Sequence, residues 1–187
     1  MVDEAALLVS VTAENMGFVD PSGMNALSRA CHEGLTKQAV AHLEAGVDID
    51  SDIDRSCNDN PGFTPLMYAA LGDRVRVVRM LIKLGADGTK TTNRASHGHE
   101  AGSTAFDLAR KLAGRDPEYA KTFAALRKRC CNTCGMTSPR DPPKRTCLKK
   151  CTACTAAGSP NAHYCSDACQ LVDWPRHRGE CAEARQA

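Results

Sequence analysis

The sequence HYCSDACQLVDWPRHRGEC, residues 163–181, contains two pairs of metal-binding side chains, each pair four positions apart. Two cysteine pairs precede it, CNTC at 131–134 and CTAC at 151–154. Such short spacings let both side chains of a pair reach one ion from a tight turn or a single helical turn. Two tetrahedral zinc ions with no open position need eight ligands, and the pairs supply Cys131, Cys134, Cys151, Cys154, Cys165, Cys169, His177 and Cys181.

This segment is too short to build a large apolar core, so its fold is expected to depend on the metal. Seven thiolates and two zinc ions together leave a charge of about minus three. Residues 130–187 carry eight Lys or Arg against five Asp or Glu, which nearly cancels that charge. We therefore expect no strong field for anions in this part of the chain.

Together the four pairs resemble the MYND-type zinc finger, whose eight ligand positions are all matched in order. The resemblance implies a cross-braced arrangement. One zinc would be held by the first and third pairs, Cys131, Cys134, Cys165 and Cys169, and the other by Cys151, Cys154, His177 and Cys181. Sixteen residues separate Cys134 from Cys151, more than is usual in the family, and Cys147 stays open as a substitute for Cys151. Cys130 is a second spare thiol that could replace a neighbouring ligand.

Disulfides are the alternative use of so many cysteines. The chain has 11, an odd number, and nine of them follow Arg129. The opening MVDEAALLVSV is acidic where a secretory signal is basic, and its apolar run is too short to cross a membrane. Zinc thiolates in a reducing compartment are therefore expected, which places the protein inside the cell, in the cytoplasm, the nucleus or both, with no membrane span.

A different pattern occupies the first two thirds of the chain, where three segments repeat at an offset of about forty residues. GFTPLMYAA at 62–70 corresponds to GMNALSRAC at 23–31 and to GSTAFDLA at 102–109. Helical stretches are predicted to follow at 75–84, 35–44 and 117–127. Thr64 and Pro65 suit a helix start, and Gly85 suits a left-handed helix end.

These units resemble ankyrin repeats, in which pairs of antiparallel helices stack into a solenoid. The histidine usual in this family is replaced by Ser28, Met67 and Asp107, which predicts loss of the hydrogen-bond network that the histidine supports. The fold expected for the whole chain is mainly α: residues 1–22 as a cap or disordered leader, about three repeats near 23–61, 62–101 and 102–129, and the finger in 130–187. Polar insertions at 50–61 and 91–101 are predicted to be exposed loops. The predicted inter-repeat core comprises Leu66, Met67, Ala69, Val77, Val78, Leu81 and Ile82, and Cys31 is expected to fill a small buried slot.

No catalytic motif is found, and four protein ligands leave a zinc ion no vacancy for water. The chain is therefore predicted to be a non-enzymatic adaptor that binds partner proteins. The MYND resemblance implies binding of short proline-containing peptides of the PxLxP kind, at the positions that match Thr152, Gln170 and Trp174. Pro175 is expected to end or bend the helix that carries Trp174. The oligomeric state stays open.

Two other functions are kept as alternatives. A nucleic-acid-associated zinc protein, such as a transcriptional regulator, would use a basic patch made of Lys144, Arg145, Lys149, Lys150, Arg176 and Arg178. The near-neutral charge of the loaded finger makes this class less favoured than protein partners. A non-catalytic relative of MYND-containing methyltransferases is the other alternative.

Overall fold

The computed structural model describes residues 24–51, 62–93, 95, 100–127, 131, 149–151, 163–165 and 167–183. Within these ranges, the side chains at 149, 150, 167, 180, 181 and 183 are not described. The predicted leader at 1–22 lies outside these ranges, as do most of the inserted loop at 50–61 and the spare cysteines 130 and 147.

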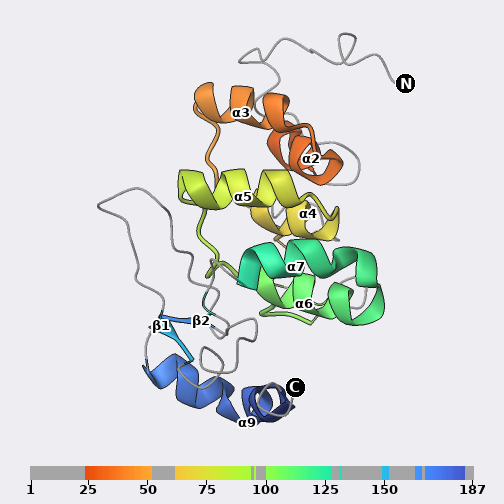
Figure 1. Ribbon diagram of the computed structural model, residues 1–187. Coiled ribbons are helices and arrows are strands. Elements are labelled where there is room, and N and C mark those ends of the chain that lie inside the picture. Colours follow the sequence, from red (N-terminus) through yellow and green to blue (C-terminus); the bar gives the residue numbers. More distant parts are fainter. Residues whose placement is uncertain are drawn as a thin grey trace.

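Three helical pairs form a stack, as the repeats predict (Figure 1). The pairs are α2 (Ala26–Glu33) with α3 (Thr36–Glu44), α4 (Pro65–Leu71) with α5 (Val75–Leu84), and α6 (Ala105–Arg115) with α7 (Ala120–Arg127), the last joined through a short 3-10 turn, η1 (Pro117–Tyr119). Figure 1 shows α2, α4 and α6 as one row and α3, α5 and α7 as a second row. We call these the first and the second row below.

The helices of the first row all begin in the same way. Asn25, Thr64 and Thr104 each accept a hydrogen bond from the backbone N–H three residues on, which satisfies one of the open donors of the first turn. Gly34 ends α2 with φ at 85°, and Gly85 ends α5 with φ at 96°, in the left-handed conformation that glycine adopts without strain. The predictions for Thr64 and Gly85 are confirmed.

A continuous apolar core runs through the stack. All seven predicted core residues are 0 or 1% exposed. Phe106 and Phe123 extend the core between α6 and α7, with ring centroids 5.4 Å apart. Cys31 is fully buried, and this burial raises the pKa of its thiol to about 12, which confirms its packing role.

The prediction of a lost hydrogen-bond network is wrong at one of the three positions. Asp107 accepts hydrogen bonds from the backbone N–H and the hydroxyl of Thr104, and its own N–H donates to Thr104 Oγ1 at 3.2 Å. Arg110 adds an ion pair to Asp107 at 2.9 Å. A carboxylate one turn into α6 therefore closes a capping box that ties down the start of this helix.

The backbone carbonyl of His32 connects the first two helical pairs. Arg74 Nε donates to the backbone oxygen of His32 at 2.8 Å. A Cβ at Gly72 would collide with that same oxygen, so only glycine fits at the end of α4. The close approach sets how near α2 and α4 can lie.

Thr92 closes the base of the second inserted loop. Its N–H donates to Ser103 O at 3.0 Å, and Gly102 N–H donates to Thr92 O at 2.7 Å. Its hydroxyl donates to Glu100 O at 3.0 Å and accepts from Ser103 N–H at 3.1 Å. Thr92 is 3% exposed, so the loop enters and leaves through a fixed, buried joint.

The cysteine-rich segment lies beyond the α6 and α7 end of the stack (Figure 1). Strand β1 (Lys149–Lys150) pairs antiparallel with β2 (His163–Tyr164), with Lys149 opposite Tyr164. Helix α9 (Asp167–Glu183) follows, with Pro175 inside it. Of the two outcomes expected at Pro175, a helix end is excluded, because α9 continues to Glu183; a bend there stays a prediction. Proline removes one hydrogen bond there without stopping the helix.

His42 is a buried ionisable group within α3. It is 8% exposed, and its Nδ1 has no hydrogen-bond partner. Burial lowers the pKa of His42 below its ordinary value of 6.5, so protonation favours the unfolded chain.

The free energy of unfolding is therefore expected to fall as the pH is lowered below 6.5, because the unfolded chain then binds a proton that His42 in the folded protein does not. His42→Leu, which supplies the residue found at the corresponding position 81 of α5, is expected to flatten this dependence. Thermal unfolding between pH 5 and 8 measures it. Equal slopes for both proteins would contradict the prediction.

Candidate metal centre and binding surfaces

Three cysteines from separate elements converge on one point. Cys131 follows α7, Cys165 follows β2 and Cys169 lies in the first turn of α9. Their sulfur atoms all lie within 4.8 Å of one another, and those of Cys165 and Cys169 are 3.5 Å apart. Zinc–sulfur bonds of about 2.3 Å in a tetrahedron place the sulfurs about 3.8 Å apart. The three thiols therefore match one face of a zinc site, and they are not in disulfides.

The second predicted set is described only in part. Cys151 follows β1 and is 2% exposed, and His177 of α9 is 1% exposed. Cys154 and the side chain of Cys181 lie outside the described residues, as does Cys134 of the first set. The structure thus buries two of the second set's ligands and leaves the geometry of the set undetermined.

A buried polar network holds α9 against β2. The Tyr164 hydroxyl donates to Asp173 Oδ2 at 2.7 Å, and Arg176 binds both oxygens of Asp173 at 2.7 and 2.6 Å. Tyr164 is fully buried, and its pKa is raised by that burial and by the hydrogen bond to Asp173. Its ring meets His177 edge-on, 6.1 Å between centroids. The network fixes the orientation of the helix that carries His177, one of the predicted zinc ligands.

The network of Tyr164, Asp173 and Arg176 is not among the features predicted from the sequence. The spacing of Asp173 and Arg176, three positions apart on a helix, is a readable signal for an ion pair. The burial of Asp173, 8% exposed, depends on where β2 lies and has no signal in the local sequence.

The outer side of α9 presents apolar side chains to solvent. Trp174 is 38% exposed, and Leu171 and Val172 are 73 and 72% exposed. The ring centroids of Trp174 and the buried His177 are 6.2 Å apart, so Trp174 covers His177 with one side and faces solvent with the other. Gln170 is half-buried one turn before Trp174. The third predicted peptide contact, Thr152, lies outside the described residues.

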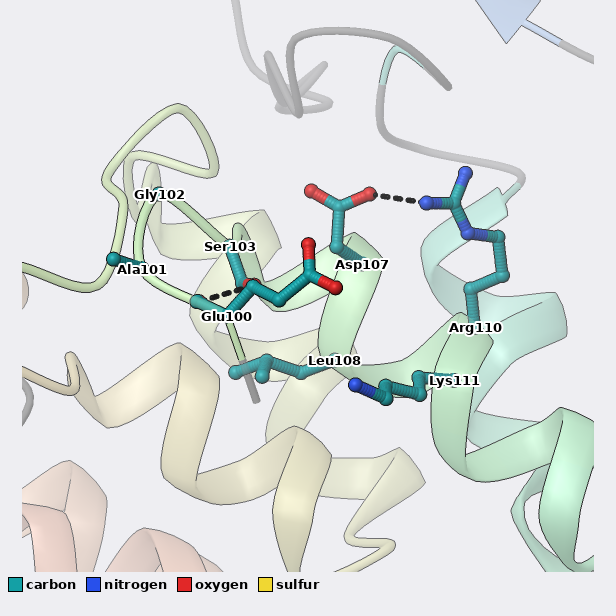
Figure 2. Close-up of a pocket in the computed structure, with 8 residues that line it drawn as sticks. All are labelled: Glu100, Ala101, Gly102, Ser103, Asp107, Leu108, Arg110 and Lys111. Atoms are coloured by element: carbon teal, nitrogen blue, oxygen red, sulfur yellow. Dashed lines mark hydrogen bonds and ion pairs between the residues drawn. The ribbon is translucent and has the colours of Figure 1, made fainter. Parts of the chain in front are cut away.

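A pocket of about 480 Å³ lies in the third helical pair, where the inserted loop meets α6 (Figure 2). The lining is Glu100, Ala101, Gly102, Ser103, Asp107, Leu108, Arg110 and Lys111. Figure 2 shows the Asp107 carboxylate paired with Arg110, the Glu100 carboxylate near Asp107, and the end of Lys111 beside Leu108. The pocket thus offers both signs of charge around a small apolar floor, a lining suited to a polar protein segment.

A stack of helical pairs followed by a small cysteine-rich module defines the class: a modular protein of repeats and a cysteine-rich domain. Comparison with known families agrees. Residues 3–92 match the model for ankyrin repeats, in three copies, and residues 131–181 match the model for the MYND finger. The chain therefore contains ankyrin repeats followed by a MYND finger. The third helical pair, α6 with α7, lies beyond the matched repeats.

A relative is Dauer abnormal formation protein 25 of Caenorhabditis elegans, 35% identical over 83 residues. The match covers 44% of this chain and 20% of the relative, so the chain spans about a fifth of the length of the relative it matches. None of the helices in the described ranges combines the length and the apolar character needed to cross a bilayer.

Proposed function

We propose that this protein is a non-catalytic adaptor that holds two protein segments, one on the ankyrin stack and one on the MYND finger. The observation that carries the proposal is the succession of two interaction modules in one chain. Zinc binding by the finger has the support of the family match and of the three converging sulfur atoms.

The finger is proposed to bind two zinc ions. Cys131, Cys165 and Cys169 would hold the first together with Cys134, and Cys151 and His177 would hold the second with Cys154 and Cys181. Both sites would then be closed by four protein ligands, which leaves the metal a structural role. Because zinc requires thiolates, the proposed location is intracellular, in the cytoplasm, the nucleus or both.

Trp174 is proposed to bind a proline-containing peptide, with Gln170 and Thr152 beside it. An exposed tryptophan face suits the flat ring of proline, and a glutamine amide can pair with an extended peptide backbone. The exposure of Trp174 on a helix whose inner side is fixed by Asp173 supports this role.

Trp174→Ala is expected to weaken binding of a labelled PxLxP peptide by about tenfold or more, because anchoring aromatic residues dominate such interfaces. Fluorescence anisotropy measures the affinity, and elemental analysis checks that bound zinc is unchanged. Leu84→Ala removes an exposed apolar side chain from the stack and is the control. Equal affinity of both variants for the peptide would refute the role of Trp174. Tight, strongly salt-dependent binding of duplex DNA by the native protein would favour the nucleic-acid alternative instead.

The stack is proposed to bind its partner at the pocket of Figure 2, next to the loop that ends at Gly102. Loops that project from a rigid repeat stack are common sites of recognition. The capping box of Thr104 and Asp107 would keep the wall of this pocket fixed on α6.

A further inference from the structure

Helix α5 carries three cations on its exposed side. Arg76, Arg79 and Lys83 follow one another at intervals of three and four residues, which places them on one face of the helix. All three are exposed, and α5 contains no acidic residue. The opposite face, which includes Val78 and Leu81, is fully buried.

These charges bring the fold little stability. Arg76 lies in the first turn, where the helix dipole disfavours cations, while Lys83 lies in the last turn, where the dipole favours them. Like charges one turn apart repel each other. Among the described residues, no side-chain hydrogen bond or ion pair involves Arg76, Arg79 or Lys83. Other arginines do bind within the fold: Arg74 binds the carbonyl of His32, and Arg110 binds Asp107.

The neighbouring helices of the second row lack such a stripe. Counted from the helix starts, α3 keeps a cation, Lys37, in the place of Arg76 but has Val40 and Glu44 in the places of Arg79 and Lys83. On α7, the guanidinium of Arg127 lies 5.9 Å from the Phe123 ring centroid. The stripe is thus a feature of α5 and is not required by the repeat.

Apolar surface borders the stripe. Leu84 is 53% exposed, whereas the leucines that form the core of the stack are buried. Met80 is half-buried one turn before it. Cations beside an exposed aliphatic side chain suit a ligand that has both carboxylates and apolar groups.

We propose that the exposed face of α5 binds an acidic protein segment that places carboxylates over Arg76, Arg79 and Lys83 and an aliphatic side chain on Leu84. The stripe spans eight residues, 76–83, which is about 10 Å along the helix. Membrane-binding basic clusters contain about four to eight cations, and DNA-binding surfaces are broader and give a domain a strong positive charge. The formal net charge of the whole chain is only +2. A short acidic segment therefore fits this surface better than a membrane or a nucleic acid.

This surface is separate from the finger and goes beyond the proposed peptide site at Trp174. The test uses the full chain and a fluorescent synthetic peptide that repeats Glu-Glu-Leu-Glu, with a Gln-Gln-Leu-Gln peptide as its neutral match. The triple variant Arg76→Gln, Arg79→Gln, Lys83→Gln is expected to bind the acidic peptide about tenfold more weakly than the native protein. Its thermal stability should be equal or higher, because like charges have been removed.

The matched control removes three exposed cations elsewhere on the stack: Lys37→Gln, Arg115→Gln, Lys121→Gln. This control has the same net charge as the triple variant and should keep native affinity. Trp174→Ala should also keep it, even if the finger fails to bind proline peptides. Equal affinities of the two triple variants, or of the two peptides, would overturn the proposal. The proposal would also be overturned if duplex DNA or phosphatidylserine vesicles bound the native protein more tightly than the acidic peptide does and lost this binding in the Arg76, Arg79, Lys83 variant.

Discussion

Removal of zinc by a strong chelator is expected to unfold the finger and to leave the helices of the stack in place. The described apolar core cluster lies entirely between Leu27 and Leu126 and includes no residue of the finger. Structural zinc contributes about 10–16 kcal/mol to small domains of this type, far more than the finger's few buried side chains can replace. Far-UV circular dichroism should therefore lose the contribution of α9, the 17-residue helix of the finger, and keep the contribution of the stack helices.

The tryptophan reports on the finger alone, because Trp174 is the single one in the chain. Its emission should shift to the red on chelation and return when zinc is added. Cys165→Ser is expected to reduce bound zinc, while Cys31→Ser, a change of the same kind in the stack core, should leave zinc content unaltered. Native emission and native zinc content in Cys165→Ser would contradict this prediction.

Leu81→Ala is expected to lower the free energy of unfolding of the stack by about 2–5 kcal/mol, through lost apolar contact and the cavity left behind. Leu81 is fully buried in the central pair. Helix α5 contacts both α3 and α7, so the loss weakens two interfaces of a structure in which each pair is stabilised by its neighbours.

Leu84→Ala provides the comparison on the same helix. Leu84 is 53% exposed, and its truncation should change stability by less than about 0.5 kcal/mol. Urea unfolding followed by circular dichroism measures both variants. A cost for Leu81→Ala no greater than that for Leu84→Ala would show that α5 is packed differently.

The helices of the stack were predictable because their signals are local. Thr64 with Pro65 marks a helix start, Gly85 marks an end, and apolar spacing identifies the buried face of α5. The capping role of Asp107 is hidden when its position is compared only with the histidine usual in ankyrin repeats. A capping box between Thr104 and a residue three positions later is itself a local signal.

The finger was predictable in its ligands' spacing and less so in its geometry. Spacing pairs Cys165 with Cys169, but the approach of Cys131 depends on how separate segments fold together. The same holds for Tyr164, whose hydroxyl reaches Asp173 only because β2 packs on α9. Proline usually ends or bends a helix because it lacks the backbone N–H, yet α9 continues past Pro175.

The joint at Thr92 has a practical consequence for engineering. Because its four hydrogen bonds to Glu100, Gly102 and Ser103 fix both ends of the loop, the start of α6 is set independently of the sequence between 93 and 100. An epitope, a fluorophore site or a longer segment inserted there should leave the register of the repeats unchanged, provided that Thr92 is kept. The loop is thus an attachment point that evolution or design can vary without rebuilding the scaffold.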